Sequence, residues 1–126
     1  MARFLGAVVV CAVAAILLGA QTAAPAVPAP ILEIFTAHCT GCHSGASPAA
    51  GMTLDADHLP ASILDKPSSK KPAFKIADTA APERSYILMK LRGAAGISGS
   101  RMPRRAKALS EADIQAIADW LAGLKR

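Results

Sequence analysis

Residues 39–43, with the sequence Cys-Thr-Gly-Cys-His, constrain the fold of this chain more than any other feature. Residues three and four apart share one face of a helix, so a helical turn would bring the two thiols and the imidazole together. Cys39 and Cys42 can each form a thioether with a haem vinyl group, while His43 binds the iron from the same side. The C-x-x-C-H spacing is typical of c-type haem attachment. We therefore expect Cys39 and Cys42 to hold a haem and His43 to be its first axial ligand.

Two other uses of the cysteine pair are weaker hypotheses. A structural zinc site needs further ligands, and no cysteine follows Cys42. His38 and His58 could complete such a site, but neither stands at a usual zinc-ligand spacing. A thioredoxin-like redox pair needs a strand–helix–strand setting, which the sequence does not indicate.

The first twenty residues have the composition of a targeting segment. Arg3 precedes an apolar run over residues 4–20, a pattern typical of secretory signals. We expect residues 1–20 to be a signal peptide, cleaved after Ala20 or shortly later. An uncleaved membrane anchor is the alternative, because the run of 17 residues (20 − 4 + 1) is at the lower limit for spanning a bilayer.

The remaining chain is predicted to contain one short linker and one domain. Residues 21–30 are rich in Pro and Ala and favour an extended tether, and residues 31–126 form the domain. Both hypotheses about the signal place this domain outside the cytoplasmic membrane, in the periplasm. Contact with the membrane is expected only if the N-terminal segment stays uncleaved.

Charge and aromatic content limit the choice of partners. The chain has 14 basic and 9 acidic residues; without Arg3 the balance is 13 − 9 = +4. Nucleic-acid binding is not expected, because no recognition motif is present and aromatic residues do not interleave with the basic ones.

Aromatic residues make up only 4% of the chain. A domain of about 100 residues is small for a self-sufficient core, so a bound macrocycle would supply missing apolar bulk.

Three segments carry clear helical signals. The first runs from residue 31 to about residue 41, with apolar residues spaced by four. The second covers residues 82–92 and is followed by Gly93, a residue suited to a helix C-terminus. The third starts after Ser110, an N-cap residue, with Asp113 at the capping-box position.

The fold class expected from these helices is all-α. No segment shows sustained period-two alternation, and only a short helical turn is indicated within residues 55–64. The first and last helices have matching apolar faces. We expect them to pack together, with Phe35 against Trp120 or Leu121.

Met102 is the favoured second iron ligand. Pro103 follows it and biases residue 102 toward extended backbone, which would present the sulfur from a stiff loop. The arginines around Met102 make a core position unfavourable. The alternatives are Met52 in a nearer loop and bis-histidine ligation through His58, whereas Met89 fits a helix core.

Six segments in this order resemble those of class I c-type cytochromes. They are F-T-A-H-C-T-G-C-H (35–43), G-M-T-L-D (51–55), P-S-S (67–69), E-R-S-Y-I-L-M-K-L-R-G (83–93), R-M-P (101–103) and L-S-E-A-D-I-Q-A-I-A-D-W-L (109–121). The resemblance implies a cytochrome c-like fold with crossed terminal helices around one covalent haem c. It also implies Cys39 and Cys42 as thioether sites, with His43 and Met102 as the axial iron ligands.

The expected function is periplasmic single-electron transfer by this haem, without enzymatic chemistry of its own. The protein would act as a carrier, or as the carrier domain of a larger oxidoreductase system. A haem enzyme subunit or gas sensor with an open or displaceable sixth site is the main alternative. A structural metal module built on the cysteines is a third possibility.

The expected partners are redox proteins with an acidic docking face. Four basic residues cluster around the favoured ligand and would form a rim near the haem edge. They are Arg101, Arg104, Arg105 and Lys107.

Overall fold

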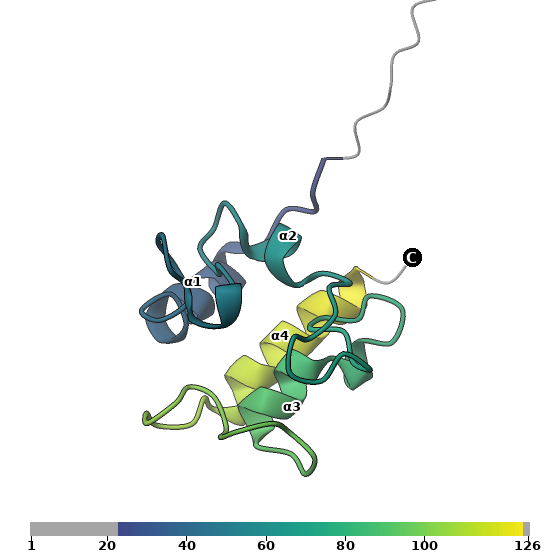
Figure 1. Cartoon of the computed structure of the whole chain (residues 1–126). Helices are drawn as coiled ribbons and strands as arrows, with labels where there is room; N and C mark the ends of the chain where they lie inside the picture. Colours follow the sequence, from purple (N-terminus) through teal and green to yellow (C-terminus); the bar gives the residue numbers. More distant parts are fainter. Residues whose placement is uncertain (1–22, 125–126) are drawn as a thin grey trace, which may run out of the picture.

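The computed structural model describes residues 23–124, and these residues form an all-α fold. The α-helices are α1 (Ala29–His38), α2 (Leu59–Ile63), α3 (Tyr86–Arg92) and α4 (Glu111–Gly123), with single 3-10 turns η1 (Ala49–Gly51) and η2 (Pro82–Arg84) (Figure 1). The described part contains no strand; isolated bridges join Leu64 to Ala77 and Pro67 to Lys75. The predicted fold class is confirmed.

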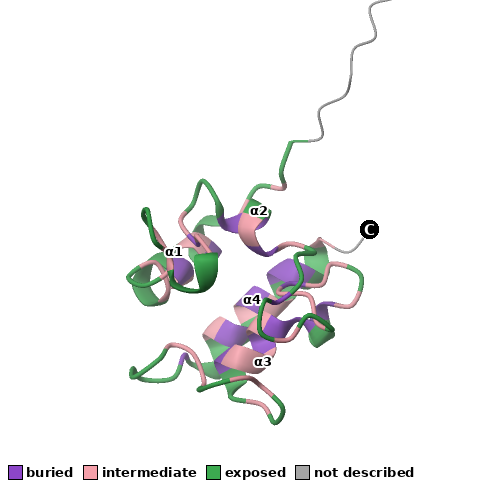
Figure 2. Cartoon of the chain, viewed as in Figure 1, coloured by how far each residue is buried: buried purple, intermediate pink, exposed green. Residues whose placement is uncertain are grey.

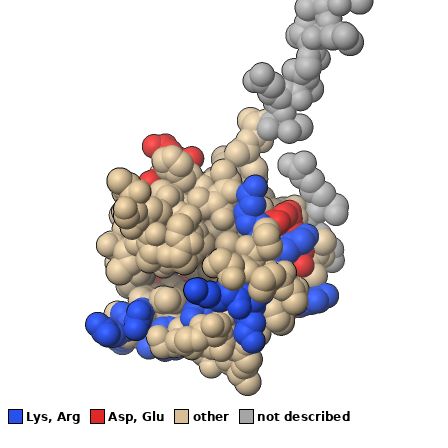
Figure 3. Space-filling view, viewed as in Figure 1, with Lys and Arg blue, Asp and Glu red and all other residues tan. Residues whose placement is uncertain are grey.

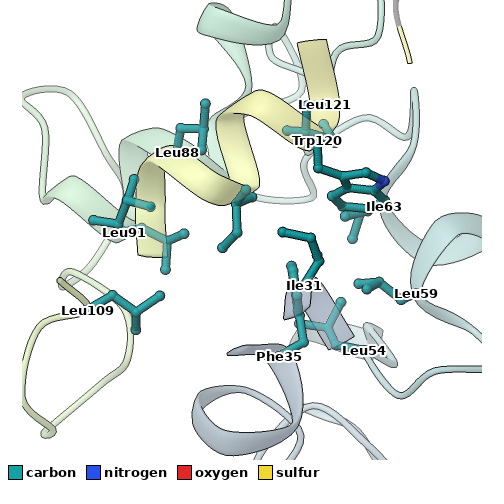
Figure 4. Packing of buried hydrophobic residues seen from close by; sticks show 13 residues of the cluster. Ile31, Phe35, Leu54, Leu59, Ile63, Leu88, Leu91, Leu109, Trp120 and Leu121 are labelled. Atoms are coloured by element: carbon teal, nitrogen blue, oxygen red, sulfur yellow. The ribbon is translucent and has the colours of Figure 1, made fainter. Parts of the chain in front are cut away.

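The first and last long helices pack together, as their apolar faces predict. The Phe35 and Trp120 rings meet edge to face, with centroids 6.5 Å apart and planes at 79°. Phe35 is 1% exposed, and Ile31 lies one turn earlier on the same buried face (Figure 4). The expected contact between Phe35 and Trp120 is therefore confirmed.

Helix α3 lies beside α4 and completes the packing (Figure 1). Leu88 and Leu91 of α3 are buried, and so are Ile117 and Leu121 of α4. Buried residues concentrate on these two helices and on the inward sides of α1 and α2, while the connecting loops are largely exposed (Figure 2). The core is thus a small cluster at the meeting of the helices.

The start of α4 is fixed by the predicted cap. The Ser110 hydroxyl accepts a hydrogen bond from the Asp113 backbone N–H at 3.1 Å and donates to the Asp113 carboxylate at 2.7 Å. The first of these bonds satisfies a backbone N–H of the first turn that has no intrahelical partner. The predicted N-cap Ser110 is confirmed, whereas the Asp113 carboxylate bonds the Ser110 hydroxyl in place of the backbone N–H that a capping box would use.

The expected helix over residues 82–92 is wrong in one respect, because it is interrupted at Ser85. Ser85 has φ −60° and ψ 126°, which is extended backbone between η2 and α3. Its hydroxyl accepts a hydrogen bond from the Asp78 backbone N–H at 2.8 Å, and the following Tyr86 N–H donates to the Lys75 carbonyl. Contacts to the preceding loop therefore break the helix. Gly93 ends α3 with φ +65°, as expected for a C-terminal glycine.

The Asp65 side chain joins separate parts of the long loop between α2 and η2. Asp65 accepts hydrogen bonds from the Lys75 ammonium at 2.8 Å and from the Thr79 hydroxyl at 2.6 Å. These donors hold the pKa of Asp65 below its ordinary value. These bonds hold the loop together, and the Tyr86 and Ile87 N–H groups of α3 donate to its Lys75 and Ile76 carbonyls.

The N-terminal hypotheses fall largely outside the described residues. The signal peptide or anchor expected at residues 1–20 lies wholly in the undescribed segment. The first helix begins earlier than expected, because α1 starts at Ala29 and the Pro28 carbonyl accepts its first hydrogen bonds. No helix within residues 23–124 is long and apolar enough to cross a membrane.

Candidate haem site

The Cys-Thr-Gly-Cys-His segment follows α1 in a series of turns. The expected helix to about residue 41 is wrong at its end, because α1 stops at His38. The Thr40 N–H bonds the Phe35 carbonyl, and the N–H groups of Cys42 and His43 both bond the Cys39 carbonyl. Residues 39–43 therefore form one further turn after the end of α1, closed by backbone hydrogen bonds to the Cys39 carbonyl.

The His43 ring is oriented by a backbone carbonyl. Its Nδ1 lies 2.9 Å from the Ala49 carbonyl oxygen. A carbonyl can only accept, so Nδ1 is the donor in this contact, and in the neutral ring Nε2 is then the nitrogen available to a metal. Metal-binding histidines typically donate their other ring N–H in this way, which fixes the tautomer and the ring orientation. His43 is therefore prepared to bind a metal through Nε2.

The two thiols are chemically distinct. Cys39 is half-buried against the core, and this burial raises the pKa of its thiol to about 11. Cys42 is exposed, and neither cysteine forms a disulfide in the described part of the chain. Covalent haem attachment requires two free thiols and an imidazole, and Cys39, Cys42 and the oriented ring of His43 supply these groups.

The loop after His43 folds back on it. The Leu54 N–H donates to the His43 carbonyl at 2.7 Å, and the Ala49 N–H donates to the Cys42 carbonyl at 2.8 Å. The Ala49 carbonyl that orients the His43 ring also accepts from the Met52 N–H at 3.2 Å. Met52 therefore belongs to the same small loop as His43.

Met102 comes from a different part of the fold. Its N–H donates to the Lys90 carbonyl of α3 at 2.9 Å. Its half-buried side chain packs against the core, contrary to the expectation from the neighbouring arginines, because Arg104 and Arg105 point to solvent and leave the methionine side chain on the core side. Arg101 is half-buried, with its guanidinium bonded to the Met102 and Ala106 carbonyls at 3.3 and 3.2 Å. The Arg101 guanidinium therefore stabilises this loop, whereas Arg104 and Arg105 are exposed to solvent.

The other candidate residues occupy less suitable positions. His38 ends α1 and is exposed, and Met89 is half-buried on α3. His58 is also exposed, and its Nδ1 lies 2.6 Å from the Asp55 carboxylate. Within residues 23–124, no group of three His, Cys, Asp or Glu residues could hold a metal ion.

One face of the molecule is hollowed. Figure 3 shows the hollow near the centre of the view, with Lys and Arg side chains gathered below it over the loop that joins α3 to α4. An all-α fold with a C-x-x-C-H turn and a prepared histidine defines a c-type cytochrome domain.

Comparison with known protein families supports the same class. The Cytochrome c family model matches residues 29–125, so the chain belongs to the cytochrome c family. No curated protein and no solved structure matches it significantly. Membership confirms the all-α cytochrome c fold and the cofactor, a covalent haem c with its iron, and it indicates electron transfer to redox partners.

Sequence reasoning missed the residues that hold the candidate ligands. Ala49 orients His43 through a backbone atom, which no side-chain motif can indicate. Lys90 and Tyr86 bind the loop before Met102 through their side chains. The only sequence signal for them is their place on the helix preceding a Gly-rich loop.

Proposed function

We propose that this protein is a periplasmic single-electron carrier whose haem iron is bound by His43 and Met102. Cys39 and Cys42 form the thioethers to the haem in this proposal. The main support is the fixed tautomer of His43, because its Nδ1–H bond to Ala49 leaves Nε2 available for iron.

The proposal of Met102 as the second ligand has separate support. Met102 is held from α3, a different element from the turn that carries His43. The Ala49 carbonyl accepts from both the Met52 N–H and the His43 ring. This shared contact favours a position of Met52 on the same side of the haem as His43. A sixth ligand must approach the iron from the opposite side, so Met102 suits the role better than Met52.

His/Met ligation would suit an electron carrier. Haem c supplies an iron that cycles between Fe(II) and Fe(III), and a methionine ligand raises its reduction potential. If His43 and Met102 both bound the iron, a substrate would have no free position on it. The protein's own part would be to hold both ligands in place.

The proposed docking surface lies on the exposed basic residues of the α3–α4 loop. These are Arg104, Arg105 and Lys107, and the described residues offer them no salt bridge. Uncompensated positive charge beside the hollowed face would steer a partner with an acidic surface.

The apolar run at residues 4–20 supports export to the periplasm, with the segment either cleaved or kept as an anchor.

The ligation is tested by optical spectra of the purified holoprotein and its Met102→Ala variant. The parent should show the weak long-wavelength absorption of a methionine–iron(III) bond, and Met102→Ala should lose it and take up carbon monoxide when reduced. Met52→Ala is the matched control and should keep the parent spectrum. Rapid uptake of carbon monoxide by the parent would instead favour the haem enzyme or gas sensor.

A further inference from the structure

The Gly-rich segment that precedes Met102 is attached to α3 by one lysine. The Lys90 ammonium donates to the Ser98 carbonyl at 2.8 Å and to the Ser100 carbonyl at 2.5 Å. The backbone carbonyl of the same lysine accepts from the Met102 N–H at 2.9 Å. Lys90 therefore contacts the segment three times within five residues of chain.

The half-buried Lys90 ammonium donates to backbone carbonyls and not to a carboxylate. The described part of the chain gives Lys90 no salt bridge, so its polar contacts there are to neutral carbonyls. Hydrogen bonds from a charged donor are stronger than those between neutral groups. Two such bonds to alternate residues fix the local course of the backbone as well as its distance from α3.

The segment has little stiffness of its own. Gly93, Gly96 and Gly99 all have positive φ, a conformation that glycine adopts without strain. Gly99 lies between the two bonded carbonyls, and a Cβ placed there would come within 4.0 Å of the Lys90 ammonium. A chain rich in glycine gains many conformations once it is released, so an external anchor is needed to keep it in one of them.

A second side chain of α3 supports the same segment. The Tyr86 hydroxyl accepts a hydrogen bond from the Ser98 N–H at 2.8 Å, and the tyrosine ring packs against Phe74. Ser98 is thus held through its N–H by Tyr86 and through its carbonyl by Lys90. The two residues lie one helical turn apart on α3 and reach the loop from the same face.

We propose that Lys90, assisted by Tyr86, is the positioning residue that keeps the Met102 sulfur available to the iron. The lysine acts through the loop backbone and does not itself bind the cofactor. This inference rests on the proposed ligation by Met102. It explains why residues 93–102 can be rich in glycine while still presenting a ligand from a fixed place.

The test measures how fast added imidazole displaces Met102 in the oxidised holoprotein. Imidazole can bind the iron only after the sulfur leaves, so the displacement rate reports opening of the segment. Lys90→Met should accelerate displacement about tenfold, the factor that corresponds to about 1.4 kcal/mol of lost anchoring. Lys90→Arg should restore part of the parent rate, because a guanidinium can also donate to two carbonyls. Lys70→Met, an equal charge change at an exposed loop residue, should leave the rate unchanged.

A second variant keeps the test valid if Lys90→Met fails to fold. Tyr86→Phe removes only the hydroxyl that accepts from Ser98 and retains the ring against Phe74. It should also accelerate displacement, by a smaller factor. The urea midpoint of each variant separates the two roles, since a purely structural residue would lower the midpoint without changing displacement in the folded protein.

The possible results distinguish this inference from the ligand assignment. Parent displacement rates in both Lys90→Met and Tyr86→Phe would overturn the positioning role, while the loss of the methionine–iron absorption in Met102→Ala would still support the ligation. Identical spectra of the parent and Met102→Ala would overturn both.

Discussion

Trp120 offers a sharp test of the helix contact that closes the fold. Its ring is 8% exposed and packs edge to face on Phe35, whereas its Nε1 is buried with no hydrogen-bond partner among the described residues. Trp120→Ala removes the whole ring, and truncations of this kind cost about 3–5 kcal/mol. Leaving a buried donor unpaired costs about 1–3 kcal/mol. Trp120→Phe removes that donor and retains an aromatic ring, so the gain offsets much of the lost apolar area.

We therefore expect Trp120→Phe to lie within about 1 kcal/mol of the parent, well above Trp120→Ala. The assay is urea unfolding of the holoprotein followed by far-ultraviolet circular dichroism. The difference between the variants follows from the midpoints and the shared slope. A loss in Trp120→Phe as large as that in Trp120→Ala would refute the reasoning, because the indole N–H would then have an acceptor in the folded protein.

Three further changes test separate parts of the account. Ser110→Ala removes the cap of α4 and should cost about 1 kcal/mol in urea unfolding, whereas Ser69→Ala at an exposed loop position should cost nothing measurable. The Asp55–His58 pair raises the pKa of His58 above its ordinary 6.5 and lowers the pKa of Asp55 below its ordinary 3.8. The pair should therefore stabilise the fold most between pH 3.8 and pH 6.5, the two ordinary pKa values. The stabilisation should decrease as pH rises through the folded His58 pKa and as pH falls through the folded Asp55 pKa. The unfolding free energy of His58→Gln should show neither decrease. Replacing Arg104 and Arg105 by Gln should slow reduction by an anionic electron donor several-fold at low salt and have little effect at about 1 M salt, where the Debye length is about 3 Å; an equal effect at both salt concentrations would contradict electrostatic steering.

Local sequence signals predicted the elements whose causes are local. The four-residue spacing around Phe35 indicated the buried face of α1, and that face does meet Trp120. Ser110 and Gly93 were identifiable because a cap hydroxyl and a left-handed C-terminal residue act within a few residues of chain. The Cys-Thr-Gly-Cys-His motif likewise predicted a local backbone turn, in which the Cys42 and His43 N–H groups bond the Cys39 carbonyl; the roles of its side chains stay a prediction.

Features that depend on distant contacts could not be predicted in this way. Ser85 interrupts the second helix because its hydroxyl binds the Asp78 N–H, a partner seven residues earlier in a loop. The end of α1 at His38 was also not predicted, although the bonds of the next turn join residues only three to five positions apart. Lys90 looks like an ordinary helix surface residue in the sequence, and only the folded loop reveals its two carbonyl partners.

The central claim is that Cys39 and Cys42 attach a haem covalently beside His43. The most direct measurement is the optical spectrum of the purified protein in alkaline pyridine, taken after extraction with acidified organic solvent. Our account predicts that the haem stays with the polypeptide and shows the spectrum of a macrocycle whose two vinyl groups have both reacted. A colourless protein, or a haem that the solvent removes, would contradict it.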